Sequence, residues 1–361
     1  MKRIPWFQPD FDNEEIIQAS KVIKTNYLNE GDVVSKFEKI VSKLLNIKYC
    51  IACTSGTSAI SLALMALDVE AKDEVIVPNF TFIATANAAK MLGAKVKLVD
   101  VDKKTLNIDP IKIKEAITDK TKCLVTVDVN GRACQYKEIL KICKEHKVKL
   151  ITDSAEAFYS NFKNKKLGTI GDIGCFSFSA MKTISTGQGG MLATNSKKLY
   201  LKLKKLKDQG RQERGTGGDD IHNHLGFNFK YTNLQASIGI AQLKKLKSRV
   251  RKFKIRDNKY TELLSPNKNI FIPPKEKKEV LQWFDILSDD IEKIKDKLRR
   301  NNIDFRSFWL PLNTQITYKE SSINYANSHS ISKKGIWLPS YFGITTNEIE
   351  FVCKKIHEVF E

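Results

Sequence analysis

Histidine and long apolar runs are both scarce in this 361-residue chain. Of five histidines only His222 and His224 lie close together, with no cysteine cluster nearby, so we expect no metal site. No stretch is long and apolar enough to cross a bilayer, so we expect a soluble protein. The seven cysteines are an odd number spread along the chain, and we expect no signal peptide. Dispersed thiols of this kind indicate a reducing compartment and predict a cytoplasmic protein.

Acidic residues are outnumbered by basic ones, 41 to 61, which gives a formal net charge of +20. Such a charge is compatible with a nucleic-acid or membrane partner, with an anionic substrate, or with a lysine-rich surface that has no function. Many of the lysines lie in amphipathic segments such as 201–207 and 243–247, which are typical of solvated helix faces. No recognisable nucleic-acid-binding module accompanies them. We therefore expect no nucleic-acid partner.

The length of the chain predicts two domains, since a single hydrophobic core rarely extends beyond about 250 to 300 residues. Predicted strands and helices alternate as far as about residue 245, which favours a mostly parallel sheet with helices on both faces. The helices are predicted at 13–24, 33–46, 55–66, 81–91 and 136–146, and the strands at 49–52, 74–77, 95–101, 123–127, 148–152 and on either side of Lys182. Long charged helices and short strands such as 280–287 follow. We expect a large domain at 1–245, including an N-terminal arm, and a smaller domain at 246–361.

One lysine stands apart from the others because of its surroundings. Lys182 lies in a polar, glycine-rich turn after a predicted apolar strand, and Asp153 ends the predicted buried strand 148–152. Ligands bind at the carboxyl ends of the strands in parallel sheets, so both side chains are expected to face one crevice. A lysine that forms a Schiff base and an aspartate that keeps a pyridine nitrogen protonated are central to pyridoxal phosphate chemistry. The pair predicts an aminotransferase, and the alternative for Lys182 is an exposed loop lysine.

The phosphate of such a cofactor needs an anion site, and the turn before helix 55–66 offers one. Residues 53–59 combine small side chains and hydroxyl groups where the helix is expected to begin. Free backbone N–H groups and the positive end of the helix dipole attract an anion at such a place. The alternative is an ordinary N-cap, because serine and threonine are preferred capping residues.

Five segments together resemble a known family in their order and spacing. They are 55–59, 81–87, 153–157, 171–190 and 226–236. They are similar to those of the sugar aminotransferases of the DegT/DnrJ/EryC1/StrS group, and the resemblance extends from about Ile4 to the C-terminus. It implies an α/β protein of the pyridoxal-phosphate-dependent transferase fold type I, the fold of aspartate aminotransferase. A mostly parallel seven-stranded sheet would form the large domain, and the small C-terminal domain would be α+β.

The resemblance also implies roles for individual residues. Lys182 would hold pyridoxal phosphate and shuttle protons, and Asp153 would pair with the protonated pyridine nitrogen. The implied cofactor contacts are Gly56, Thr57, Ser58 and Ser177 at the phosphate, Phe82 stacked on the ring, Glu156, and Asn228 reaching the phosphate from a neighbouring subunit. A homodimer with active sites shared across the interface follows. His222, Lys230 and Arg306 would contact the sugar nucleotide.

For several of these residues a structural interpretation stays open. Phe82 is also compatible with a core position, because an apolar-strand phenylalanine is more often core than a stacking partner. His222, Lys230 and Arg306 are each compatible with a surface or structural ion pair.

The residue at position 156 refines the predicted reaction. Many members of the group that aminate carbon 3 of the sugar have glutamine there, whereas this chain has Glu156, as in sequences that resemble perosamine synthases. The run from Lys182 to Gly190, with Gln188, is similar to the same branch. We therefore predict transfer of an amino group from L-glutamate to a nucleotide-linked 4-keto-6-deoxyhexose. Transfer to a 3-keto sugar is the alternative, with Glu156 then a local hydrogen-bonding variant.

Two other functions are disfavoured by the same residues. Relatives of this fold that remove the 3-hydroxyl of a GDP-linked 4-keto sugar have histidine at the Schiff-base position, whereas this chain has Lys182. A non-catalytic regulator or nucleic-acid-binding protein on the same fold would need neither Lys182 nor Asp153. The nucleotide, the sugar and the configuration of the new amine stay open.

Overall fold

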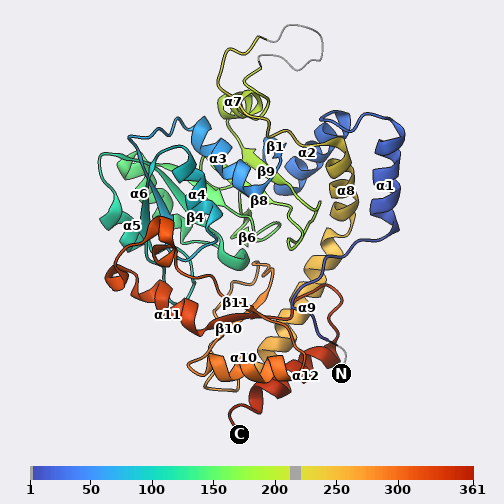
Figure 1. Cartoon of the computed structure of the whole chain (residues 1–361), viewed down its shortest axis with the longest axis vertical. Helices are drawn as coiled ribbons and strands as arrows, with labels where there is room; N and C mark the ends of the chain where they lie inside the picture. The colour runs from blue at the N-terminus through green and yellow to red at the C-terminus, as the bar shows by residue number, and fades with distance from the viewer. Residues whose placement is uncertain (1–2, 212–220) are drawn as a thin grey trace.

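A seven-stranded sheet forms the centre of the larger part of the molecule (Figure 1). The structure is a computed structural model that describes residues 3–211 and 221–361. The strands are β1 (Tyr49–Cys53), β2 (Glu74–Pro78), β3 (Lys95–Val99), β4 (Thr121–Val127), β5 (Lys149–Asp153), β8 (Ile173–Ser177) and β9 (Gly190–Thr194). They lie in the order β1-β9-β8-β5-β4-β2-β3. Because β9 runs antiparallel to both its neighbours and the other neighbouring strands are parallel, the predicted mostly parallel sheet is confirmed.

Helices cover both faces of this sheet (Figure 1). They are α2 (Asp32–Leu45), α3 (Gly56–Ala66), α4 (Ala84–Met91), α5 (Pro110–Ala116), α6 (Tyr136–His146), α7 (Lys197–Lys207) and α8 (Asn233–Lys244). The helix α1 (Asn13–Lys24) packs against α8. Alternate residues of a strand face opposite sides of a sheet. Val75 and Val77 of β2 pack with α3 and α4 in one core, whereas Ile76 between them packs with α5 and α6 in another. The helices α2 and α8 pack on the part of the sheet that contains β1 and β9.

A second, smaller group of elements follows α8. It contains α9 (Leu246–Leu264), β10 (Phe284–Leu287), α10 (Ile291–Arg300), β11 (Arg306–Ser307), α11 (Ala326–Lys334), β12 (Gly335–Leu338) and α12 (Thr346–His357). The strands form an antiparallel sheet in the order β10-β12-β11. Ile4 of the N-terminal arm joins the core of this group and bridges to Ile303. Conversely, Leu312, Tyr318 and Tyr325 pack in the core of the large sheet, so contacts cross the proposed domain division near residue 245 in both directions.

Short elements complete the described chain. They are the two-stranded ribbon β6 (Asn161–Phe162) and β7 (Lys165–Lys166), and the 3₁₀ turns η1 (Val129–Gly131), η2 (Leu312–Thr314), η3 (Ile316–Tyr318) and η4 (Ser322–Asn324). No helix in the part of the chain that the structure describes is both long enough and apolar enough to span a bilayer.

Three predicted elements are shorter by two or more residues in the structure. The strand predicted at 95–101 ends at Val99, the last residue of β3. The strand predicted at 280–287 is confined to β10, because the N–H groups of Gln282 and Trp283 bond to Asn130 across the molecule instead. The helix predicted from residue 81 begins at Ala84, where α4 starts.

One lysine contradicts the prediction that the run 201–207 presents its lysines to solvent. The side chain of Lys207, at the end of α7, is 2% exposed. Its Nζ lies 3.0 Å from a carboxylate oxygen of Glu30 and 3.4 Å from one of Glu38, and it donates to the carbonyl of Ala52 at 3.0 Å. Lys207 follows the buried Leu203 by four residues, so the helical repeat places both on the inner face of α7.

Candidate active site

Polar side chains gather where β5 and β8 end. Asp153 is the last residue of β5, Ser177 is the last residue of β8, and Lys182 lies in the turn that follows β8. The turn is closed by a hydrogen bond from the N–H of Lys182 to the carbonyl of Ser179 at 3.1 Å. Parallel strands bring their carboxyl ends to one edge of a sheet, which is why residues distant in sequence meet here.

Lys182 has a partly buried side chain, 14% exposed. Its Nζ lies 3.4 Å from Oε1 of Glu156, and 5.3 Å from the ring centre of Trp283, which precedes β10. A surface lysine would instead extend into water, so the alternative of an exposed loop lysine is wrong. The long contact with a single carboxylate also leaves the amine incompletely paired, which suits a group that reacts.

Asp153 is a buried carboxylate, 6% exposed, that makes hydrogen bonds but no ion pair within the described ranges. Its Oδ2 accepts from Oγ1 of Thr85 at 2.8 Å, and its Oδ1 accepts from the N–H of Ala155 at 3.1 Å. Burial raises the pKa of the Asp153 carboxyl, and the hydrogen bonds and the charge of Lys182 offset that rise only in part. A cation placed against this carboxylate would therefore be strongly attracted to it.

Glu156 links Lys182 to the turn that follows β4, the strand that pairs with β5. Its side chain is 7% exposed, with Oε1 facing Lys182 and Oε2 accepting the backbone N–H of Asn130 at 3.0 Å. Asn130 belongs to η1, the turn after β4. The carboxylate is thereby fixed at both oxygens, so its position beside Lys182 is defined by the fold.

The start of α3 combines an N-cap with free backbone donors. Ser55 and Ser58 form a capping box, in which each side chain accepts the other's backbone N–H, at 3.0 and 2.9 Å. The alternative of an ordinary cap is thus correct for these two serines. The N–H groups of Gly56 and Thr57 have no acceptor among residues 3–211 and 221–361, and Thr57 is exposed. An anion site and a cap therefore coexist here.

Ser177 and Gly56 lie against each other. A Cβ added to Gly56 would lie 2.9 Å from Cβ of Ser177, closer than real side chains approach, so a larger residue would displace the end of β8. Gly56 and Ser177, two of the predicted phosphate contacts, therefore lie together at the start of α3.

Phe82 is 53% exposed, which contradicts a core position for its ring. Its carbonyl accepts the N–H of Thr85 at 3.2 Å, and Thr85 in turn donates to Asp153. The exposed ring is thereby connected to the buried carboxylate through one turn of chain.

His222, Asn228 and Lys230 lie together on a different part of the molecule. They belong to the segment that pairs with residues 208–211, through the bridges Asp208 to Asn228 and Arg211 to His222. Nδ1 of His222 lies 2.7 Å from the carbonyl oxygen of Gln209, and Nζ of Lys230 lies 2.9 Å from Asp208. Within residues 3–211 and 221–361, no hydrogen bond or ion pair joins Asn228 or Lys230 to Lys182 of the same chain, and Asn228 is exposed.

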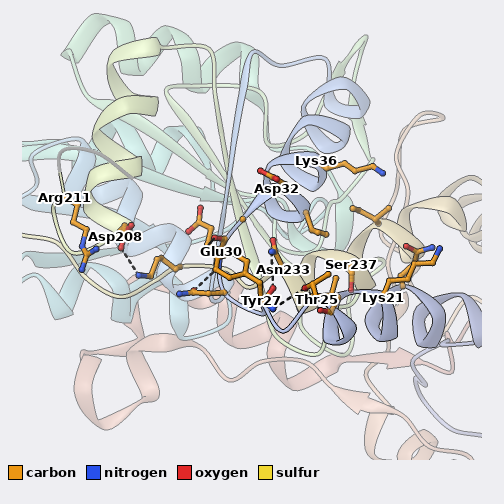
Figure 2. A pocket seen from close by; sticks show the side chains of 17 residues that line it. Lys21, Thr25, Tyr27, Glu30, Asp32, Lys36, Asp208, Arg211, Asn233 and Ser237 are labelled. Carbon is orange, nitrogen blue, oxygen red and sulfur yellow. Dashed lines mark hydrogen bonds and ion pairs between the residues drawn. The ribbon is translucent and has the colours of Figure 1, made fainter. Parts of the chain in front are cut away.

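A cavity of about 880 Å³ opens beside Lys230. It lies between α1, α2, α8 and residues 208–211, as Figure 2 shows. Its lining carries both signs of charge, with Lys21, Lys36, Lys230, Glu30, Asp32 and Asp208 among the residues. The ion pair seen for Lys230 agrees with the structural interpretation of this residue, and its place on the cavity wall agrees with the binding interpretation.

Arg306, unlike His222 and Lys230, contacts Met181, the residue that precedes Lys182. Its guanidinium is 5.2 Å from the ring centre of Trp6 and 5.9 Å from that of Trp337, and its Nη1 is 3.9 Å from Sδ of Met181. Arg306 therefore rests on an aromatic surface beside the residue that precedes Lys182.

Three residues that contact this site were not predicted. Thr85 lies within the segment 81–87, whose resemblance was noted without a role for the hydroxyl. Asn130 and Trp283 carry no motif that marks them, and they reach the site only because η1 and the segment before β10 meet in the folded chain.

A seven-stranded sheet of this topology, with a partly buried lysine and a buried aspartate where its strands end, is the architecture of a pyridoxal-phosphate-dependent sugar transaminase. The chain belongs to the DegT/DnrJ/EryC1/StrS aminotransferase family, whose model matches residues 9–357. The predicted family, fold class, enzyme class and pyridoxal phosphate cofactor are confirmed.

Individual relatives agree with this assignment. A GDP-perosamine synthase of Escherichia coli O157:H7 is 32% identical over 368 residues, which cover 100% of this chain and 99% of that protein. A UDP-4-amino-4,6-dideoxy-N-acetyl-beta-L-altrosamine transaminase of Campylobacter jejuni is 33% identical over 246 residues, 67% of this chain and 65% of that protein. The X-ray structure of an aminotransferase from Psychrobacter cryohalolentis matches with a TM-score of 0.92 and 26% identity, over 99% of both chains.

Proposed function

We propose that the protein transfers the amino group of L-glutamate to carbon 4 of a nucleotide-linked 4-keto-6-deoxyhexose. The product would be a 4-amino-4,6-dideoxy sugar nucleotide of the perosamine or viosamine type. The observation that carries the proposal is the contact between Lys182 and Glu156, because glutamate at this position accompanies 4-amination in similar sequences. Relatives named for perosamine synthesis and for a 4-amino-4,6-dideoxy sugar support it.

The residues around Lys182 suit the cofactor. Asp153 lacks a cationic partner among the residues described, and a protonated ring nitrogen would supply the missing positive charge. The free N–H groups of Gly56 and Thr57 suit the phosphate, with Ser177 beside them and Ser58 in the same helical turn. The exposed ring of Phe82 is available for stacking. When bound, pyridoxal phosphate supplies an electron sink for the substrate carbon.

Lys182 would attach the cofactor and then move a proton at the substrate carbon. Its Nζ would be released from Glu156 when it reacts, since the contact of 3.4 Å is long for a charge-assisted hydrogen bond. Trp283 closes one side of the amine and limits access of water.

We also propose a homodimer with shared active sites in the cytoplasm. Asn228 is exposed and, among the described residues, makes no hydrogen bond to Lys182 of its own chain. A contact between Asn228 and the cofactor phosphate would therefore come from the second subunit. Lys230 and His222 would act from that same segment, whereas Arg306 would act beside Lys182 of its own chain. All seven cysteines are free thiols, which supports the cytoplasmic location.

The shared site has a direct test in hybrid dimers. Mixing Lys182→Ala and Asn228→Ala subunits would create one site per hybrid with both residues intact. We expect the mixture to regain roughly a quarter of wild-type activity, because random pairing makes about half of the dimers hybrids, each with one intact site. Activity no higher than the sum of the two separate variants would contradict sharing.

The reaction itself is tested with a substrate panel. The protein is incubated with pyridoxal phosphate, L-glutamate and nucleotide-linked 3-keto or 4-keto sugars, and the new amine is located by NMR. Amination at carbon 4 is the expected outcome. Amination at carbon 3 alone would overturn the regiochemistry while leaving the transaminase assignment intact.

A further inference from the structure

Asn130 uses every polar group it possesses at the junction between the two sheets. Its N–H donates to Oε2 of Glu156 at 3.0 Å, and its carbonyl accepts the N–H of Gln282 at 3.2 Å. Its side-chain oxygen accepts the N–H of Trp283 at 2.8 Å. Its side-chain amide donates to the carbonyl of Trp283 at 2.8 Å and to Oδ2 of Asp285 at 3.0 Å. The residue is completely buried.

Two of these partners contact Lys182 directly. Glu156 approaches Nζ of Lys182 with one oxygen, and the ring of Trp283 lies 5.3 Å from the same nitrogen. Glu156 comes from the large sheet, whereas Trp283 comes from the segment that leads into β10. Asn130 is therefore hydrogen-bonded to both residues that contact the lysine from two sides.

The turn that carries Asn130 is itself fixed in place. Its φ of 55° is left-handed, a conformation that asparagine tolerates better than most residues. A Cβ on the next residue, Gly131, would lie 2.1 Å from the carbonyl oxygen of Val280, so η1 and the segment before β10 are in close contact. Arg132 then makes two hydrogen bonds to Asp285, at 2.6 and 2.7 Å, with both side chains buried.

We propose that Asn130 is a positioning residue, which holds Glu156 and Trp283 in register around Lys182. This inference rests on the proposed function for its effect on the reaction, although its effect on Lys182 is a property of the protein without cofactor. Asn130 does not touch the amine, so it acts only through these two neighbours. Loss of its amide would free the backbone of Trp283 and loosen the turn whose N–H fixes Glu156.

The informative variant is Asn130→Gly. Glycine accepts the left-handed conformation and keeps the backbone N–H that Glu156 requires, so only the side-chain bonds to Trp283 and Asp285 are lost. Asn313→Gly is the matched control. Asn313 is also a buried asparagine and exchanges two hydrogen bonds of 2.9 Å with Asn79, but it contacts neither Glu156 nor Trp283.

Two measurements test the proposal, and the first needs no cofactor. Acylation of Lys182 by an amine-directed reagent is followed in the cofactor-free protein by peptide mass spectrometry. Because Glu156 and Trp283 restrain the amine, we expect Asn130→Gly to accelerate labelling of Lys182 about threefold to tenfold, and Asn313→Gly to leave it unchanged. In a Trp283→Leu background the acceleration should be smaller, because Asn130→Gly keeps the N–H that fixes Glu156 and so acts on the amine through Trp283.

The second measurement is steady-state kinetics with the loaded enzyme. We expect kcat to fall about tenfold to a hundredfold in Asn130→Gly, with KM changed less than about threefold, because positioning errors act mainly on the chemical step. Asn130→Asp is a second variant, in which the lost donor and a new charge beside Asp285 should act in the same direction.

Equal labelling rates in wild type, Asn130→Gly and Asn313→Gly would overturn the proposal. So would a full, additive effect of Asn130→Gly in the Trp283→Leu background. A wild-type protein that transfers no amino group would instead contradict the proposed function, and the labelling result would still decide the role of Asn130.

Discussion

Two lysines with carboxylate neighbours, the buried Lys207 and the partly buried Lys182, lie in different regions of this molecule, and they differ in how completely they are paired. Nζ of Lys207 contacts Glu30, Glu38 and the carbonyl of Ala52 within 3.4 Å. Nζ of Lys182 has one carboxylate contact, at 3.4 Å. Burial acts to lower the pKa of Lys207, but Glu38 and Glu30 outweigh burial and raise it.

We propose that this difference separates a structural lysine, Lys207, from a reactive one, Lys182. The ammonium of Lys207 is enclosed by acceptors, and its removal would leave two carboxylates without their cation. Lys182 makes one long contact with a carboxylate, that of Glu156. Its charge also acts on Asp153, a buried carboxylate that forms no ion pair within the described ranges. We propose that completeness of pairing, together with burial, marks the different functions of these two lysines.

Lys182→Ala is expected to have the largest effect on activity. Loss of the amine should reduce transamination by about 10⁴-fold or more and remove the visible absorbance of bound cofactor, because no other group here can attach it. Lys182→Arg is the control that keeps the positive charge, and it should be equally inactive. Retention of more than about a tenth of the activity in either variant would refute the role of Lys182.

Asp153→Asn should reduce kcat by about 10²-fold or more. The asparagine keeps the shape of the side chain but loses the charge that would hold a proton on the ring nitrogen. Because burial raises the pKa of Asp153, the cofactor-free variant should be at least as stable as wild type at pH 8, as measured by urea unfolding. An unchanged kcat would remove Asp153 from the mechanism.

Lys207→Met should act on stability and not on chemistry. Removing the buried ammonium that the partly buried Glu30 and Glu38 share should lower the free energy of unfolding by about 3–5 kcal/mol. At a temperature where the variant is folded, kcat should stay within about threefold of wild type. Lys198→Met, an exposed lysine of the same helix, should change stability by less than about 0.5 kcal/mol. A large loss of kcat in the folded Lys207→Met protein would erase the distinction between the two lysines.

Asp128→Asn should change how stability depends on pH. Burial raises the pKa of Asp128 to about 7, against hydrogen bonds from Ser154 and Tyr136. The folded state therefore keeps a proton that the unfolded state has released, and stability declines as the pH rises from about 4 to 7. Without this group, the loss of unfolding free energy between pH 5 and pH 8 should shrink by about 1–3 kcal/mol. Equal pH dependence in both proteins would show that Asp128 does not titrate in this range.

Much of the site could be predicted from local patterns. Asp153 ends a short apolar strand, Lys182 follows another, and a hydroxyl-rich turn opens a helix, so chain order and the rule for parallel sheets are enough to bring them together. The sheet followed from the same alternation of elements.

The rest depended on contacts that no local pattern encodes. Lys207 was predicted to face solvent because its run is lysine-rich, yet the helical repeat aligns it with the buried Leu203. Asn130 and Trp283 meet only when η1 packs against the segment before β10, about 150 residues later in the chain. The same packing removes the first residues of the strand predicted at 280–287, which begins at Phe284 in the structure. Side-chain bonds of this kind are decided by tertiary structure.

The most direct test of the central claim is to find which lysine carries the cofactor. The protein is loaded with pyridoxal phosphate, reduced with borohydride and digested, and the peptides are analysed by mass spectrometry. We expect one reduced cofactor adduct per chain, on the peptide that contains Lys182, and no adduct on Lys207. An adduct on another lysine, or none at all, would contradict the role of Lys182 as the residue that carries the cofactor.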